Sequence, residues 1–561
     1  MIIGIDMGGT NIDGVLIRDG RLIKTVKNPV DRNDYFYSIW NCLAQLIEDV
    51  NKHDINRIQL STTICTNAIV EDNVSRVGMI LQPGPGLHWE FDRLGEEIAY
   101  ISGSVDHRGK LVKAIVRNEL AEIKRRFQAG PVESIAVVTK FSTRNPEPEQ
   151  QVKQFLRSDY SNITLGHTMS GKLNFPRRVE TAYLNAAVSQ TFRTFADYIQ
   201  QALLQEGITA PVYILKADGG TIDLVRAIDK PVETILSGPA ASFMGMTALL
   251  EQAQTDQVLL DIGGTTTDIF VLVDGIPVFE PLGIMIDGRK TLVRAIFSQS
   301  IGLGGDSHVR FESGELKIGP KRLDRAVAFG GQHITPSDAL VYLGKMPGDF
   351  PEKSKVALEV MAQNHGIDPV MLAERIIHQF CCTIDQTIQQ ILERFHQVPV
   401  YTIRELLQDR KIKPRSVGLI GGPAKALASD LEHILELPVT YPQHYQVANA
   451  IGAALAKPTM EINLMIDTER DVLLIPELDI HQTPGQYIDL SKAKWFALDR
   501  IKAAEKNMGL TDDQLEGEIV EANSFNMVQG YYRVDKNIRV KAQIRPGLLQ
   551  RLVDDGQGVD S

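Results

Sequence analysis

The sequence predicts an α/β protein with two related lobes, a mostly helical insertion and a small α+β module at the C-terminal end. Three observations lead to this prediction. A segment near the N-terminus of the 561-residue chain is repeated further along, with Asp6 returning as Asp261, an offset of 255 residues. Apolar residues recur every three or four positions over about residues 291–400, which is typical of amphipathic helices. Strand-like apolar runs resume after about residue 461.

The repeated segment runs from Ile5 to Gly20 and again from Leu260 to Gly275 without a gap, and 7 of the 16 aligned residues are identical. Each copy places Asp-x-Gly-Gly-Thr between two apolar, β-rich runs. Asp-Gly pairs then predict tight turns into third strands. Each copy is therefore expected to form a three-stranded meander, with strands over 2–5, 14–17 and 21–26 and over 258–260, 269–273 and 276–279. This order of elements excludes the usual strand–loop–helix phosphate motifs.

The chemistry of the two Gly-Gly turns suggests a phosphate ligand. Glycine lets backbone N–H groups approach an anion closely, and consecutive N–H groups in a tight turn form an anion-binding concavity. Thr10 and Thr265–Thr267 add hydroxyl donors. The neighbouring aspartates repel phosphate, so they imply a divalent cation or a water to be deprotonated. The alternative is a pair of plain hairpins in which Asp and Gly serve turn geometry alone.

A third Gly-rich turn, Gly421-Gly422, follows an apolar run and precedes a helical pattern that ends near Leu435. Two glycines before a helix N-terminus allow close approach of a nucleoside or a phosphate. Lys425 lies in the first turn of this helix, where it could reach a phosphate or simply be a surface lysine. Two stretches of small residues, about 179–187 and 447–456, predict closely packed helices that form a hinge contact between the lobes.

Composition and charge argue against several classes of protein. A net charge of −11 lacks the basic excess that is typical of nucleic-acid binders. No apolar run approaches the roughly 20 residues that cross a bilayer, and the N-terminus carries no signal-peptide pattern. The four cysteines are too sparse for a disulfide framework. We therefore expect a cytoplasmic protein that binds neither nucleic acid nor membrane.

Taken in order, these motifs resemble the actin / sugar-kinase / heat-shock-chaperone ATPase superfamily, in which two ribonuclease-H-like lobes close on Mg-ATP. Within that superfamily the chain most resembles the A-type members of the hydantoinase/oxoprolinase family (N-methylhydantoinase A-like). The resemblance covers roughly residues 2–457. Beyond the two hairpins, the stretches that support it, all in the family's order, are 61–68, 141–146, 217–220, 234–241, 301–307 and 449–455.

The resemblance implies an ATP-dependent hydrolase that opens a cyclic amide of the hydantoin or 5-oxoproline type after Mg-ATP phosphorylates its carbonyl. The residues that it implies for ATP are Gly8, Gly9, Thr10, Asn11, Gly263, Gly264, Thr265, Thr266, Gly421, Gly422 and Lys425. Those that it implies for Mg²⁺ are Asp6, Asp13, Asp261 and Asp268. We expect Asp6 or Asp261 to be catalytic, orienting or deprotonating the nucleophile. A partner subunit of the B type or a homo-oligomer is a further implication.

The segments expected near the substrate depart from the family pattern. The chain has Leu60-Ser61-Thr62-Thr63 where the family typically has His-Gly-Thr-Thr, and its 298–308 segment also differs. The substrate candidates are Thr62, Thr63, Asp306 and His308. These departures leave two other functions open, a chaperone-like ATPase that reactivates a partner enzyme and a small-molecule kinase of the sugar type. The absence of a Cys-rich zinc segment argues against the kinase.

The expected domain limits follow from the positions of the repeats. Residues 1–180 are assigned to the first ribonuclease-H-like lobe, and residues 181–290 and 400–457 to the second. Residues 291–400 form the helical insertion, and residues 461–561 form the small C-terminal α+β module.

Overall fold

The computed structural model places the chain in two compact units, each described by itself. The first unit comprises Met1–Ala240, Glu280–Ala295 and Ala453–Gln550, and the second comprises Ala241–Phe279 and Ile296–Gly452 with a short stretch from Arg551. The residues that the structure describes are 1–8, 11–31, 34–86, 91, 94–250, 254–280, 282–397, 411–485, 488–507, 510, 517–529 and 533–553.

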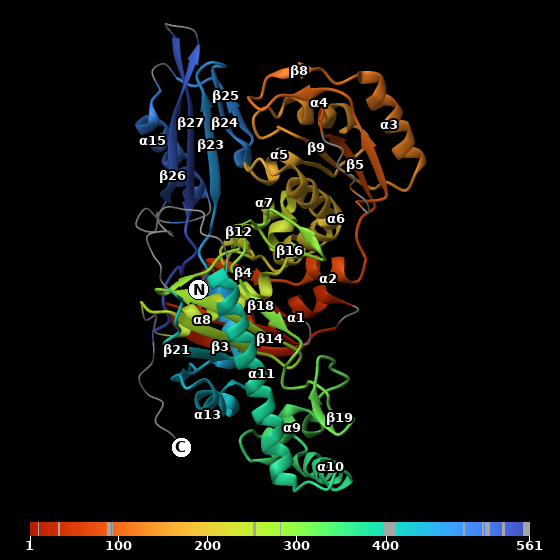
Figure 1. Ribbon diagram of the computed structural model, residues 1–561, viewed down its shortest axis with the longest axis vertical. Coiled ribbons are helices and arrows are strands. Elements are labelled where there is room, and N and C mark those ends of the chain that lie inside the picture. Colours follow the sequence, from red (N-terminus) through yellow and green to blue (C-terminus); the bar gives the residue numbers. More distant parts are fainter. Residues whose placement is uncertain are drawn as a thin grey trace. The chain divides into compact units, whose positions relative to one another are not determined.

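The first repeat forms the predicted meander within a six-stranded sheet of the first unit (Figure 1). Strands β1 (Ile2–Met7), β2 (Asn11–Arg18) and β3 (Arg21–Pro29) pair in antiparallel fashion. β1 also pairs in parallel with β4 (Arg57–Ser61), and β4 with β11 (Val212–Leu215). β12 (Thr221–Asp223) completes the order β12-β11-β4-β1-β2-β3.

The second repeat forms the same meander in the second unit. β13 (Gln257–Ile262), β14 (Thr267–Val273) and the short β15 (Ile276–Pro277) are antiparallel, and β13 pairs in parallel with β21 (Ser416–Ile420). β22 (Val439–Thr440) extends this sheet beyond β21, while β18 (Gln299–Ile301) pairs with β14. In each unit the apolar residues of the central strands enter a buried core.

The two compact units divide the chain differently from the expected lobes. Residues 181–240 and 280–295 group with the first repeat rather than with the second. The reason is strand pairing: β11 adds in parallel to β4, and helix α6 (Phe175–Gln205), which crosses residue 180, packs on the core of that sheet. A parallel pair needs a long crossover connection, so a strand can join a sheet from far along the chain.

Two further sheets belong to the first unit. Strands β10 (Ile163–Leu165), β9 (Ser134–Thr139), β5 (Val77–Gln82) and β6 (Glu97–Tyr100) form a parallel sheet. The C-terminal segment forms a five-stranded sheet under one helix, α15 (Leu490–Asn507). The strands of that sheet are β23 (Glu461–Asp467), β24 (Val472–Ile475), β25 (Ile480–Gln482), β26 (Gly517–Gln529) and β27 (Arg533–Ile544).

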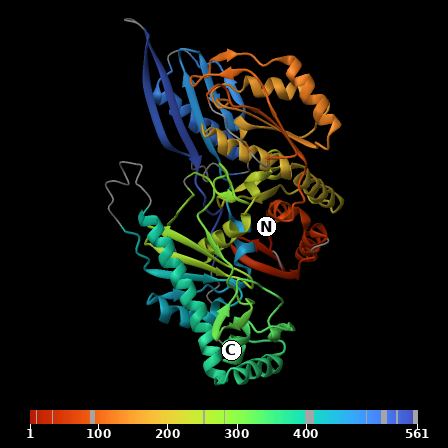
Figure 2. The same cartoon turned by 45° about the vertical axis from the view of Figure 1, so that its right-hand side comes forward.

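The segment expected to be a helical insertion is helical in its second half. Helix α9 (Pro336–Tyr342), α10 (Pro351–Asn364) and the long α11 (Pro369–Gln397) lie together (Figures 1 and 2). The part before them contains β18 and the hairpin of β19 (Val309–Glu312) and β20 (Glu315–Ile318). Among the described helices, none combines the length and the apolar character that a bilayer crossing requires.

A buried histidine links the parallel sheet to the C-terminal segment. In α5 (Gly166–Met169), His167 Nδ1 lies 2.6 Å from Glu149 Oε2 and Nε2 lies 3.2 Å from Asp479 Oδ1. Burial opposes a charged imidazole, but the two carboxylates raise the pKa of His167 above its ordinary 6.5. Burial likewise opposes a charged Glu149, but His167, the Arg178 charge and a backbone hydrogen bond lower the pKa of that carboxyl below 4.5.

We expect this cluster to make stability depend on pH. The raised pKa of His167 adds stability that is complete below about pH 6.5 and is lost as the pH rises through the folded-state pKa. The lowered pKa of Glu149 adds stability that is complete above about pH 4.5 and is lost as the pH falls through its folded-state pKa. The melting-temperature difference between wild type and His167→Asn should therefore be largest between these two values and shrink at alkaline pH.

Calorimetry across this pH range measures the difference, with His53→Asn at an exposed site as the control. A difference between wild type and His167→Asn that is the same at acidic and alkaline pH would contradict the charged pairing.

Candidate active site

The two hairpins share one backbone geometry. The Gly8 N–H donates to the Asn11 carbonyl at 3.0 Å, and the equivalent Gly263 N–H donates to the Thr266 carbonyl at 2.9 Å. A Cβ atom on Gly8 or Gly263 would lie only 3.2 or 3.3 Å from that same carbonyl oxygen. The repeat therefore preserves a tight turn that glycine favours. Gly9 and Thr10 lie outside the described residues.

The strand register places a pair of aspartates at the base of each turn. Asp6 stands opposite Asp13 between β1 and β2, and Asp261 stands opposite Asp268 between β13 and β14. Side chains directly opposite on antiparallel strands lie about 5 Å apart at Cβ. Each hairpin therefore brings two carboxylates together beside its Gly-rich turn.

The four carboxylates have different surroundings. Asp13 accepts a hydrogen bond from Lys27 Nζ at 2.8 Å, and Asp6 is buried with 5% exposure. Asp261 Oδ2 accepts hydrogen bonds from Ser242 Oγ at 2.6 Å and Asn449 Nδ2 at 3.4 Å. These two donors lie on α8 (Ser237–Leu249) and α14 (Ala448–Leu455) and fix the direction of the Asp261 carboxylate.

The surroundings of Asp268 disfavour its charged form. Burial and then the charge of Asp261 raise the pKa of Asp268 to about 6, against a hydrogen bond from Ser300 that lowers it. Because two carboxylates in one buried place repel each other, a cation beside them would favour the charged form of both. The Asp261–Asp268 pair is thus suited to a divalent cation.

The loop that follows β18 packs directly against the second hairpin. The Gly305 N–H donates to the Gly263 carbonyl at 2.9 Å, and the Asp306 N–H donates to the Gly264 carbonyl at 2.7 Å. A Cβ atom on Gly304 would lie 2.6 Å from the Gly264 backbone. Glycine at position 304 is therefore required by this close approach of two chain segments.

Arg322 adds a positive charge at the same turn. Its Nη2 lies 2.8 Å from Asp306 Oδ2, and its Nη1 donates to Thr265 Oγ1 at 3.3 Å. Burial raises the pKa of Asp306, and the Arg322 charge opposes that effect. The structure thus places Asp306 at the hairpin, as a partner of an arginine rather than as a solvated loop residue.

The third Gly-rich turn meets the second hairpin at Asp261. Gly421 has φ of +96°, and a Cβ atom there would lie 2.3 Å from the Ile262 carbonyl oxygen and 2.8 Å from Asp261 Oδ1. Gly422 is exposed, with no atom within 4 Å of its Cβ position, so its face is open to a ligand. Lys425 is exposed in the first turn of α13 (Ala424–Leu435).

The remaining substrate candidates lie in structural contacts. Thr62 is buried, and its Oγ1 accepts the Ile64 N–H at 3.2 Å at the start of α2 (Ile64–Val70). Thr63 caps the same helix and accepts a hydrogen bond from Asn67 Nδ2 at 3.3 Å. The His308 ring packs edge-on against His333, with centroids 5.2 Å apart. None of these contacts is made with a described residue of the two Gly-Gly turns.

Sequence reasoning missed three of the residues at this site. Ser242 and Asn449 hold Asp261, and Arg322 holds Asp306. Asn449 and the helix that carries Ser242 lie in or next to stretches that support the family resemblance, which is a signal that could have singled them out. Nothing in the sequence around Arg322 distinguishes it from other surface arginines.

Two family models match the chain. One, described as Hydantoinase/oxoprolinase N-terminal region, matches residues 2–160, and the other, described as Hydantoinase/oxoprolinase, matches residues 178–462. A solved structure, the ATP-dependent caprolactamase from Pseudomonas jessenii, has a TM-score of 0.70 at 18% identity and covers 98% of this chain and 88% of its own. This likeness confirms the α/β fold class.

Two curated relatives are similar in sequence. The alpha subunit of the Pseudomonas jessenii caprolactamase is 23% identical over an alignment of 460 residues that covers 76% of this chain and 65% of that protein. The acetophenone carboxylase gamma subunit of Aromatoleum aromaticum is 23% identical over an alignment of 450 residues that covers 70% of this chain and 60% of that protein. The chain thus spans less than two thirds of the length of either relative.

The neighbouring glycines 421 and 422 offer a matched test of the turn. Gly421→Ala should lower stability by about 1–3 kcal/mol, because a side chain is strained at this φ and collides with the hairpin. Gly422→Ala should change stability by no more than about 0.5 kcal/mol, because its Cβ position is open. Thermal unfolding of both variants checks this, and equal losses would contradict the described packing.

Proposed function

The chain belongs to the hydantoinase/oxoprolinase family, as its motifs predicted, and we propose that it is an ATP-dependent hydrolase that opens a cyclic amide. The observation that supports this most is the duplicated hairpin. The cross-strand aspartate pair and the glycine N–H hydrogen bond both recur at the same offset. The geometry of a tight turn alone would not require both features to recur in the second hairpin.

The hairpin residues fit Mg-ATP by their chemistry. Mg²⁺ is usually bound by one or two carboxylates together with phosphate oxygens and waters. Each hairpin offers such a pair, Asp6 with Asp13 and Asp261 with Asp268, and the described residues contain no group of three or more acidic, His or Cys side chains that could bind a metal without phosphate. When bound, the ion would neutralise phosphate charge.

The protein groups then have separate roles in this proposal. Backbone N–H groups of the turn at 263–266 hold phosphate oxygens, and the open Gly422 of the same unit admits the nucleoside. Asp261, fixed by Ser242 and Asn449, or Asp6 orients the nucleophile. Arg322 lies beside Thr265, where its charge can act on a transferred phosphoryl group.

The proposed reaction balances with two waters. The amide oxygen attacks the γ-phosphorus, and the bond to the β-phosphate oxygen breaks to release ADP. Water adds to the activated carbon, and the ring nitrogen leaves as an amine, which opens the ring and forms an acyl phosphate. A second water releases phosphate and a carboxylate. ATP therefore makes a stable amide open at neutral pH, because phosphorylation of the amide oxygen makes the carbonyl carbon electrophilic enough for water to attack.

The names of the relatives favour a lactam-type substrate and a partner subunit. The two curated relatives are named as subunits, of a caprolactamase and of a carboxylase. We propose that this chain likewise works with a B-type subunit or as a homo-oligomer. The carboxylase relative favours ATP-dependent carboxylation of a ketone as the second candidate, because phosphorylation of a carbonyl oxygen is the first step that both reactions could share.

Substituting the hairpin aspartates tests the nucleotide site. Asp261→Asn or Asp6→Asn should lower the ATP-dependent rate about 10²–10⁴-fold, because the nucleophile loses its orienting carboxylate. The exposed Asp349→Asn is the matched control and should keep the rate of the wild type. If both hairpin variants keep wild-type turnover, the site is placed wrongly.

Substrate choice is tested with the purified chain, alone and with its B-type subunit. Caprolactam, 5-oxoproline and a hydantoin should each be assayed for ADP release and for the ring-opened acid by mass spectrometry. We expect at least one cyclic amide to stimulate ADP release with one opened ring for each ATP. Stimulation by acetophenone with bicarbonate and by no amide would replace the hydrolase with a carboxylase.

A further inference from the structure

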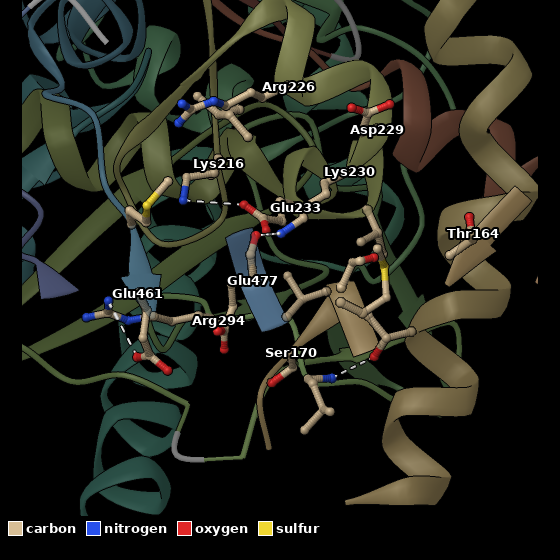
Figure 3. Close-up of a pocket in the computed structure, with 18 of the residues that line it drawn as sticks. Thr164, Ser170, Lys216, Arg226, Asp229, Lys230, Glu233, Arg294, Glu461 and Glu477 are labelled. Carbon is tan, nitrogen blue, oxygen red and sulfur yellow. Dashed lines mark hydrogen bonds and ion pairs between the residues drawn. The ribbon is translucent and has the colours of Figure 1, made fainter. Parts of the chain in front are cut away.

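A cavity of about 510 Å³ lies within the first unit, and no residue of either hairpin turn lines it (Figure 3). It opens where β11 ends, so Lys216 and Asp218 form part of its wall. The other walls come from the segment after β10, from residues 292–294 and from 459–461 and 477–479. The carboxyl ends of parallel strands are where open α/β sheets usually bind ligands. No candidate residue predicted from the sequence lines this cavity.

The acidic side chains nearest β11 are neutralised within the wall. Lys216 Nζ lies 3.4 Å from Asp218 Oδ2 and 3.5 Å from Glu233 Oε2. Asp218 also accepts hydrogen bonds from Thr459 Oγ1 at 2.9 Å and from the Gly220 N–H at 3.1 Å. Figure 3 shows Lys216 and Lys230 converging near Glu233. These carboxylates therefore have little capacity left for a cationic ligand.

The acids on the opposite wall are also occupied. Glu477 accepts hydrogen bonds from the Gly171 N–H at 2.7 Å and from Asn463 Nδ2 at 2.6 Å. Glu461 lies 2.9 Å from Lys541 Nζ. Asp479 Oδ1 accepts a hydrogen bond from His167 Nε2 at 3.2 Å. Asp229 and Lys153 are exposed members of the lining and offset each other in charge.

Three cations of the lining keep unused donors. Lys172 Nζ makes no hydrogen bond or ion pair with any described residue, and burial lowers the pKa of Lys172. Lys230 Nζ donates to the carbonyl oxygen of Glu477 at 3.1 Å and to no carboxylate among the described residues. Arg226 Nε lies 3.4 Å from Asp223 Oδ2, while its Nη1 is buried without a hydrogen-bond partner in the described part of the chain. Each of these three side chains therefore keeps at least one cationic donor for a ligand.

Part of the lining is apolar, and the cavity is larger than an inorganic anion needs. The apolar lining includes Leu165, Met169, Val232, Leu292 and Met460. A volume near 510 Å³ falls within the range of about 300–1,000 Å³ that is usual for small-molecule sites. The free donors of these three cationic side chains favour an anionic group, and the apolar side chains favour a hydrocarbon part attached to it.

We propose that this cavity binds a small organic carboxylate, with Lys172, Lys230 and Arg226 as donors to the carboxylate and the apolar wall against its chain. The binding goes beyond the proposed ATP reaction and does not depend on it. Charge-assisted hydrogen bonds are the strong ones in proteins, so these three donors should dominate the affinity.

Isothermal titration calorimetry on the full chain without nucleotide tests this proposal. The probes are valerate, glutarate, inorganic phosphate and valeramide, the uncharged analogue of valerate. We expect saturable binding of valerate or glutarate, at least about 10-fold tighter than that of valeramide or phosphate. Lys172→Met should weaken carboxylate binding about 10-fold or more, whereas Lys172→Arg should restore most of it.

Two controls separate this result from a folding defect and from the nucleotide site. Lys113→Met changes an exposed lysine of β8 (Leu111–Lys113) in the same unit and should bind the carboxylate like wild type. Asp261→Asn, which tests the ATP reaction, should also leave carboxylate binding unchanged. The proposal is overturned by no saturable carboxylate binding up to roughly 10 mM, by equal affinity for valerate and valeramide, by a preference for phosphate, or by wild-type affinity in Lys172→Met.

Discussion

The proposed nucleotide site depends on one constraint, the parallel pairing of the first strand of each repeat with a strand much further along the chain. β1 pairs with β4 up to Asp6↔Ser61, and β13 pairs with β21 up to Asp261↔Ile420. In each unit the parallel register reaches the aspartate at the end of the strand. The loops that follow the two paired strands therefore lie at the same edge of that unit's own sheet. Gly421 follows the partner of Asp261 directly, which explains why any side chain there would collide with the carboxylate.

The two copies of the repeat share a backbone but not an electrostatic environment. Asp13 is paired with Lys27, whereas Asp268 is half-buried opposite Asp261 with a pKa raised to about 6. Asp261 is in turn fixed by hydrogen bonds from two helices. The hairpin is formed by residues close together in the sequence, so both copies of the repeat keep it. The residues that contact its aspartates come from distant segments, so they can differ between the two copies.

The same sheet edge in the first unit carries the carboxylate-binding cavity that we propose. Lys216 and Asp218 follow β11, which is parallel to β4 and β1, so they lie at the edge where the first hairpin turns. The caprolactamase structure keeps this fold at 18% identity, because strand pairing and apolar burial tolerate many side chains. Side chains that line a cavity are under no such packing constraint, and they decide what is bound.

The sequence by itself determined the two meanders, their Asp-Gly turns, the aspartate pairs and the family, because each follows from residues within about 20 positions of one another. It did not determine that β11 and β12 join the first sheet, since a parallel crossover leaves no local pattern. Nor could it single out Arg322 at the second hairpin or Lys172 in the cavity. The partners of these side chains, or the lack of them, are set by contacts between distant segments, and only the tertiary structure decides those.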